Sequence, residues 1–168
     1  KSESDKGHKK SMQMIYNILK EKDKIKYWMH LEDDWEFFIE DNYITKSIEY
    51  LNKYSNSHNV KQILFNKGYS EILNDETWIC GEILEDGLSL HVKDQENAPC
   101  GYWPHYSFRP SITLKNTIME LGDFYSDSTF FELAYAYKYF EAGYKTAYFD
   151  RVSCIHIGKL AGPRGKDS

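Results

Sequence analysis

The chain has 168 residues, of which 41% are hydrophobic and 16% aromatic, enough apolar material for one domain with a single core. The formal net charge of −5 excludes a broad basic surface, so nucleic acid is not expected as a partner. No apolar run approaches the length of a membrane span, so no span is expected in this chain.

The first 65 residues predict a helix, a strand, a second helix and a second strand. Apolar side chains at helical spacing predict helices over Ser11–Lys20 and Ile44–Tyr54. Short apolar runs predict buried strands over Tyr27–Leu31 and Val60–Phe65. This order favours an α/β sheet with crossover connections.

Two short strands are predicted in the middle of the chain, on either side of a tight turn. Trp78–Ile83 and Leu88–Val92 flank the dipeptide Asp86-Gly87, which favours a β-hairpin. Residues 102–111 then hold four aromatic rings, one histidine and one arginine around two prolines. A rigid aromatic loop of this kind fits a pocket wall, and it equally fits packing at the edge of the core.

The last third predicts one helix and two strands. Ser128 or Thr129 is the expected N-cap of a helix over residues 130–140, which Gly143 closes. Strands are then predicted over residues 146–149 and 152–156.

Three consecutive carboxylates, Glu32, Asp33 and Asp34, follow the strand predicted over Tyr27–Leu31. Because a strand alternates its faces, we expect Glu32 and Asp34 to project to one side and Asp33 to the other. Two carboxylates at one strand end suit a divalent cation. The alternative interpretation is a solvated acidic turn, but apolar flanks on both sides make clustered charge costly without a cation or hydrogen bonds.

Two further polar residues stand at the ends of predicted elements. Glu132 lies in the first turn of a predicted helix, where a carboxylate ordinarily complements the helix dipole. His156 ends the last predicted strand, where a histidine is more often structural than a ligand.

Four features occur in a defined order along the chain. They are Asp5-Lys6-Gly7 followed by Ser11-Met12-Gln13, then Leu31-Glu32-Asp33-Asp34, then Phe131-Glu132 followed by Gly143-Tyr144-Lys145, and last His156. Their order and spacing resemble the nucleotide-sugar-dependent glycosyltransferases of the GT-A fold, especially the family 2 type. The stretch from Lys1 to Phe38 also resembles uncharacterised glycosyltransferase-like proteins of giant DNA viruses.

The resemblance implies a role for each matching residue. Asp34 corresponds to the family's metal-binding aspartate, His156 to its second metal ligand, and Glu32 to its partner at the nucleotide. Glu132 corresponds to the catalytic base. The implied cofactor is Mn²⁺ or Mg²⁺, because carboxylate oxygens favour both ions and an imidazole ligand favours Mn²⁺.

The implied reaction is an inverting transfer of a sugar from a nucleoside-diphosphate sugar to a hydroxyl of a carbohydrate or glycoprotein acceptor. Further donor contacts are expected from Asp33, Gly7 and Lys159. Lys159 belongs to a Gly-rich basic tail, residues 159–168, which fits either closure over phosphates or a flexible solvated segment. Aromatic stacking and polar character nominate the sugar-pocket candidates, which are Trp103, His105, Tyr106 and Arg109.

The sequence departs from the family in three places. Met12 and Gln13 replace an Arg and an Asn of the first motif, and Phe131-Glu132 replaces Glu-Asp. The family's first strand–helix–strand unit has no counterpart. We therefore expect residues 1–168 to form a single domain equivalent to the C-terminal two-thirds of a GT-A domain, with a partial, mixed GT-A-like α/β sheet flanked by helices.

Two other functions remain open at this point. One is a metal-dependent phosphoryl or nucleotidyl transferase that uses the same acidic strand end. The other is a non-catalytic carbohydrate-binding module derived from a glycosyltransferase. A cytoplasmic location, or the host cytoplasm or virion of a virus, is expected because no signal peptide opens the chain and three widely spaced cysteines favour a reducing compartment.

Overall fold

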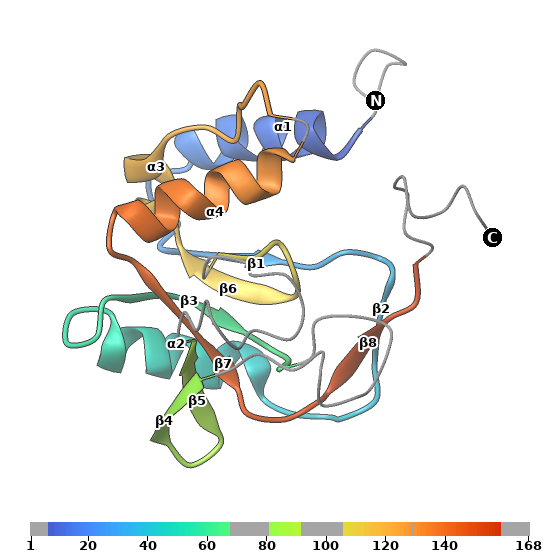
Figure 1. Cartoon of the computed structure of the whole chain (residues 1–168), viewed down its shortest axis with the longest axis vertical. Coiled ribbons are helices and arrows are strands. Elements are labelled where there is room, and N and C mark those ends of the chain that lie inside the picture. Colours follow the sequence, from blue (N-terminus) through green and yellow to red (C-terminus); the bar gives the residue numbers. More distant parts are fainter. Residues whose placement is uncertain (1–6, 68–80, 92–105, 129, 159–168) are drawn as a thin grey trace.

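A helical layer lies against a mixed sheet, with one further helix on the opposite side of the sheet (Figure 1). The computed structural model describes residues 7–67, 81–91, 106–128 and 130–158. The helices are α1 (His8–Lys20), α2 (Tyr43–Tyr54), α3 (Lys115–Leu121) and α4 (Phe131–Glu141). The strands are β1 (Tyr27–His30), β2 (Trp35–Phe37), β3 (Val60–Leu64), β4 (Gly81–Glu85), β5 (Leu88–His91), β6 (Ser111–Leu114), β7 (Lys145–Phe149) and β8 (Cys154–His156).

Six strands form the main sheet in the order β1-β6-β3-β7-β5-β4. Strands β3 and β7 are parallel, and the other neighbouring pairs are antiparallel. A second, two-stranded sheet pairs β2 with β8 in antiparallel fashion. The mixed sheet flanked by helices confirms the predicted α/β class.

Two hydrophobic clusters hold these layers together. The first lies between the sheet and the layer of α1, α3 and α4, and the second lies between the sheet and α2. Both are rich in aromatic rings. The first contains Met12, Leu19, Trp28, Tyr106, Phe108, Ile118, Phe124, Phe131, Tyr135, Ala136 and Tyr139. The second contains Leu51, Tyr54, Val60, Ile63, Phe65, Leu88, Leu90, Ile112, Ala147 and Phe149.

The aromatic residues just before β6 belong to the first cluster. Tyr106 is only 1% exposed, and its ring packs against those of Phe108, Tyr135 and Tyr139 at centroid distances of 5.2, 5.1 and 5.2 Å. A ring enclosed in this way offers no face to a sugar. The prediction of Tyr106 as a sugar-pocket residue is therefore corrected to a core residue, in line with the alternative of core packing.

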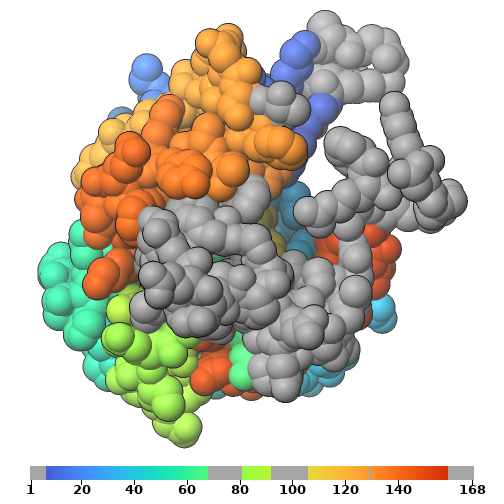
Figure 2. Space-filling model, viewed as in Figure 1, coloured from blue at the N-terminus to red at the C-terminus, as the bar shows by residue number. Residues whose placement is uncertain are grey.

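The predicted hairpin is confirmed over its described residues. Glu85 pairs with Leu88, so Asp86 and Gly87 form a two-residue turn, and Gly87 adopts the positive φ of 76° that such turns require. The space-filling view shows this hairpin, in light green, at the lower end of the molecule, away from the orange helices at the top (Figure 2).

The start of α4 differs from the predicted cap. Phe130 is the N-cap and supplies no side-chain hydrogen bond, while Ser128 Oγ accepts a bond from the Phe130 N–H at 3.1 Å. Ser128 therefore shapes the approach to the helix rather than capping it, and Thr129 lies outside the described residues. Within the parts of the chain that the structure describes, no helix has the length and apolar character that a membrane span needs.

Candidate functional site

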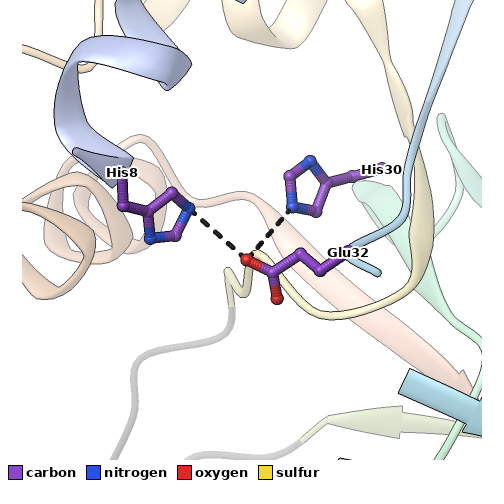
Figure 3. A group of neighbouring side chains, drawn as sticks. All are labelled: His8, His30 and Glu32. Carbon is purple, nitrogen blue, oxygen red and sulfur yellow. Dashed lines mark ion pairs between the residues drawn. The ribbon is translucent and has the colours of Figure 1, made fainter. Parts of the chain in front are cut away.

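Two histidines and a glutamate meet at the end of β1, where Figure 3 shows the three side chains pointing toward one another. His8 is the first residue of α1, His30 is the last residue of β1, and Glu32 follows two residues later. Glu32 Oε1 lies 3.5 Å from His8 Nε2 and 3.9 Å from His30 Nε2. We call these three residues the Glu32 group.

Glu132 joins this group from the first turn of α4. Its Oε1 accepts a hydrogen bond from His8 Nδ1 at 2.9 Å, so each ring nitrogen of His8 faces a carboxylate. The rings of Phe108 and Phe131 meet the imidazole of His8 edge-on, at centroid distances of 5.7 and 5.3 Å. These contacts bring the N-terminal ends of α1 and α4 together beside the end of β1.

The histidines and carboxylates of this site stabilise each other's charged forms. The hydrogen bond to Glu132, together with the negative charges of Glu132, Glu32 and Asp34, raises the pKa of His8 despite the opposite effect of its partial burial. Partial burial alone would raise the pKa of Glu32, but the neighbouring His30 and His8 hold it below its ordinary value. The group is thus an ion-paired cluster that holds Glu32 as a carboxylate.

His30 is the buried member of the Glu32 group. Its side chain is 10% exposed, and its ring packs edge-on against Trp28 and Phe108 at centroid distances of 5.3 and 5.9 Å. Its Nε2 atom is buried and has no hydrogen-bond partner among the described residues. A buried nitrogen without a partner carries a desolvation cost that some other interaction must offset.

A second histidine–carboxylate contact, the Asp34–His156 pair, involves the last residue of the turn that follows β1. His156 Nε2 is 3.0 Å from Asp34 Oδ2, although the two residues are 122 positions apart in the chain. The β2–β8 register creates this contact, because Trp35 lies opposite His156 and the Ile157 N–H donates to the Asp34 carbonyl at 2.8 Å. The structure therefore brings together the two residues that the sequence predicts as metal ligands.

The carboxylate of Asp34 packs closely against Gly158, and one of its oxygens has no hydrogen-bond partner among the described residues. Its Oδ1 is buried and makes no hydrogen bond to any described residue. Gly158 packs directly against it, since a Cβ on Gly158 would lie 2.3 Å from Asp34 Oδ2 and 2.9 Å from its Cγ. Only a glycine at position 158 leaves Asp34 in this place.

Trp35 connects the two histidine–carboxylate contacts. Its indole Nε1–H donates to Glu32 Oε2 at 3.3 Å, and its ring lies 5.3 Å from the ring of His156. The Glu32 group and the Asp34–His156 pair therefore lie on either side of Trp35.

The expected alternation of the three carboxylates is wrong. Strand β1 ends at His30, and Asp33 and Asp34 form a turn rather than continuing the strand. Glu32 and Asp34 consequently have different histidine partners instead of sharing one strand face. Asp33 is exposed at the surface of the turn.

The remaining predicted site residues fall in three places. Gly7 is the N-cap of α1, directly before His8. Arg109 is half-buried, its Nε donates to Ser107 Oγ at 2.8 Å, and its charge acts on the thiol of Cys154 in β8. Trp103, His105 and Lys159 lie outside the described residues.

Sequence reasoning missed His8 and His30. The available signal was local: His30 precedes Glu32 by two positions at a strand end, and His8 follows the glycine that opens α1. Their meeting with Glu132 depends on how α1 and α4 pack, and no spacing in the chain reports that.

An open, largely apolar hollow of about 540 Å³ lies by β1, β2 and α2, with Met29 and Leu31 in its wall. Of its two carboxylates, Glu40 and Asp41, the second is already paired with Lys46 and Arg151.

We place the candidate site at the acidic turn, because two histidine–carboxylate contacts meet there and because His30 Nε2 and Asp34 Oδ1 are buried there without a hydrogen-bond partner among the described residues. No protein-family model and no curated protein matches the sequence.

Proposed function

We propose that the protein is an inverting, metal-dependent glycosyltransferase that moves a sugar from a nucleoside-diphosphate sugar to a hydroxyl of a carbohydrate or glycoprotein. The observation that carries the proposal is the 3.0 Å contact between Asp34 and His156, two residues assigned as metal ligands from a family resemblance alone. Glu132 lies within hydrogen-bonding reach of the Glu32 group across the same turn.

The Asp34–His156 pair has the character of a cation site. Its donors are a carboxylate and an imidazole, a set that suits Mn²⁺ and tolerates Mg²⁺. Asp34 Oδ1 is buried without a partner, and Gly158 is the only residue type that leaves space for this carboxylate. Both features fit a divalent ion, which would supply Lewis-acid neutralisation of the departing diphosphate.

Glu132 is the proposed catalytic base. Its Oε1 accepts a bond from His8, so the second oxygen is the one that would take the proton of the acceptor hydroxyl. Its side chain is 34% exposed, which leaves it accessible to an acceptor. Attack on the anomeric carbon from the face opposite the diphosphate is a single displacement, and it inverts the anomeric configuration.

His8 is the proposed positioning residue for Glu132. The imidazole is clamped between two aromatic rings, and its Nδ1–H holds one carboxylate oxygen. A base held by a packed partner needs less reorganisation when the acceptor arrives. Glu32, whose two oxygens face the histidines and Trp35, is proposed to hold this arrangement rather than to contact the nucleotide.

Donor contacts are proposed for Asp33 in the turn and for Gly7 at the start of α1, with Lys159 as the predicted phosphate partner. Arg109 stays a proposed sugar-pocket residue, and its charge acts on the thiol of Cys154 in β8, the strand that carries His156. The assignments of Asp33, Gly7 and Lys159 rest on the family resemblance.

The test is a donor-binding measurement on the full chain. Thermal stability is recorded with UDP-, GDP- and TDP-sugars, each with and without Mn²⁺, and released nucleoside diphosphate is assayed in parallel. We expect one nucleotide class to raise Tm only when Mn²⁺ is present. Asp34→Asn should abolish that shift, while the matched control Asp23→Asn, at an exposed aspartate outside the acidic turn, should retain metal-dependent binding.

Three results would overturn the proposal. A chain that no nucleotide sugar stabilises is not a transferase of this kind. Release of nucleoside monophosphate or sugar 1-phosphate in place of nucleoside diphosphate would show attack at phosphorus and favour a phosphoryl or nucleotidyl transferase. Binding of free carbohydrate by both the wild-type chain and Asp34→Asn, with no turnover in either, would favour a carbohydrate-binding module.

A further inference from the structure

We infer that His8, His30 and Glu32 form a zinc site, separate from the Asp34–His156 pair. This inference goes beyond the proposed sugar transfer and does not depend on it. Each residue of the Glu32 group offers one ligand atom, and these three atoms all lie within 4.8 Å of one another. His8 Nε2 and His30 Nε2 both face Glu32 Oε1.

The spacing of these atoms suits a small metal ion. Zinc–nitrogen bonds of 2.0–2.1 Å place tetrahedral ligands about 3.3 Å apart. The two distances to Glu32 Oε1 are 3.5 and 3.9 Å, so modest side-chain rotation closes the set around an ion. Figure 3 shows both imidazole nitrogens already aimed at the same carboxylate oxygen.

His30 supplies the observation that points most directly to a ligand. Its side chain is nine-tenths buried, and its Nε2 atom is buried without a hydrogen-bond partner while facing Glu32. Two aromatic rings hold the imidazole in this orientation. A metal bond would take the place of the hydrogen bond that Nε2 lacks, since Glu32 Oε1 lies 3.9 Å away, beyond hydrogen-bonding distance.

His8 has the outer partner that metal-binding histidines usually have. A histidine ligand normally donates its second ring N–H to a carboxylate, which sets the tautomer and makes the other nitrogen a better donor. Glu132 accepts from His8 Nδ1 at 2.9 Å, and this leaves Nε2 turned toward Glu32. The indole of Trp35 bonds the other oxygen of Glu32 in the same supporting manner.

The donor set and its exposure favour Zn²⁺ with an open position. Two imidazoles and one carboxylate are a recognised zinc set, and three protein ligands leave a fourth place for water or substrate. The side chains of His8 and Glu32 are 38% and 31% exposed, so the ion enters from the solvent side while His30 closes the buried side. A bound ion would tie the start of α1 to the end of β1.

The test uses the full chain, stripped of metal by a chelator. Co²⁺ is titrated first, because its visible absorption reports the number and type of ligands, and Zn²⁺ is then added in competition. The double variant Asp34→Asn with His156→Gln removes the other candidate site. The wild-type chain is titrated in parallel, so that zinc binding can still be measured if the double variant fails to fold.

Single substitutions in both backgrounds identify the ligands. His8→Gln and Glu32→Gln alter partly exposed side chains, so they avoid the core damage expected from replacing His30. The matched controls are His58→Gln and Glu36→Gln, which change exposed residues of the same type away from the group.

We expect one Zn²⁺ per chain in the double variant, with a rise in Tm. His8→Gln and Glu32→Gln should each weaken zinc binding by about 100-fold, and Glu132→Gln by about 10-fold, because the outer partner of His8 keeps its acceptor oxygen but loses its charge. The controls should bind zinc as tightly as their backgrounds. Equal zinc affinity in His8→Gln, Glu32→Gln and their controls, or no zinc binding in either background, would overturn the inference and leave the group as an ion-paired cluster.

Discussion

Glu32 and Asp34 are only two residues apart in the sequence, but the Glu32 group and the Asp34–His156 pair are assembled in different ways. The Asp34–His156 pair is formed by one strand pairing, in which the β2–β8 register sets a histidine beside an aspartate. The Glu32 group depends on the packing of α1 and α4 against the end of β1. A backbone register defines the first, and side-chain packing defines the second.

The two sites should therefore be sensitive to different substitutions. The Asp34–His156 pair should respond to changes in the backbone around Gly158, and the Glu32 group should respond to changes in the aromatic rings that hold its histidines. Single substitutions should therefore affect the two sites separately, and the largest effect is expected at Glu132.

Glu132→Gln should produce the largest change, because it removes the proposed base while keeping a hydrogen-bond acceptor for His8. We expect kcat for sugar transfer to fall by about 10²- to 10⁴-fold. Donor binding in the presence of Mn²⁺ should be unchanged, since Glu132 is not part of the Asp34–His156 pair. Loss of donor binding equal to the loss of turnover would contradict the assignment of Glu132 as base.

Gly158→Ala should disturb only the Asp34–His156 pair. The new Cβ would lie 2.3 Å from Asp34 Oδ2, so the carboxylate must move. Mn²⁺-dependent donor affinity should fall by about 10- to 100-fold, the usual range when the surroundings of a ligand are changed.

The matched control for this change is Ile157→Ala. It truncates an exposed side chain next door and keeps the N–H that bonds the Asp34 carbonyl. Zinc affinity of the Glu32 group should be unaffected by either substitution. A similar loss of Mn²⁺-dependent binding in Ile157→Ala would show that the effect is not specific to the position of Asp34.

Phe108→Leu should loosen only the Glu32 group. The ring of Phe108 is 4% exposed and contacts both His8 and His30 at centroid distances of 5.7 and 5.9 Å. We expect the free energy of unfolding to fall by about 1 kcal/mol, as in other near-volume-conserving core changes, together with weaker zinc binding. Chemical denaturation and zinc titration measure the two effects.

Phe65→Leu is the comparison for this change, because Phe65 is 2% exposed and belongs to the other hydrophobic cluster. It should lower stability by a similar amount and leave zinc affinity unchanged. Equal loss of zinc affinity in both variants would mean that general loosening, rather than the contacts of Phe108, controls the Glu32 group.

The smallest effect concerns pH in the metal-free protein with chelator present. The pKa of His8 is raised on folding, so its contribution is complete below its ordinary pKa of 6.5 and is lost as pH rises through the raised value. The pKa of Glu32 is lowered, so its contribution is complete above 4.5 and is lost as pH falls through the lowered value. The group should stabilise the fold most between these two values.

His8→Gln should therefore reduce stability most between pH 4.5 and 6.5, and less at higher pH. The difference should stay below about 1 kcal/mol, because His8 and its partners are about one-third exposed and solvent screens their charges. A difference that grows as pH rises above 6.5 would contradict the raised pKa.

The periodic parts of the fold could be predicted from the sequence. The helices α1 and α2, the strands β3 and β7, and the Asp86-Gly87 turn follow from apolar spacing and turn chemistry that act within a few residues. The short strands β2 and β6 and the helix α3 were not predicted, because their few residues leave no clear period and their partners lie far along the chain.

The residues of the candidate site divide in the same way. Asp34 could be nominated from its place after an apolar strand, and the family resemblance added His156 and Glu132. His8 and His30 could not, because an isolated histidine carries no pattern. The expected alternation of Glu32 and Asp34 failed because β1 stops at His30, which sequence spacing alone does not reveal.

The sequence by itself determined the α/β character, the main helices, the acidic turn and the chemistry available there, since these depend on residue type and local spacing. Only the tertiary structure decided which histidine meets which carboxylate. Helices α1 and α4 and strand β8 come from opposite ends of the chain, and their contacts with the acidic turn arise from core packing and strand register, which act through space rather than along the sequence.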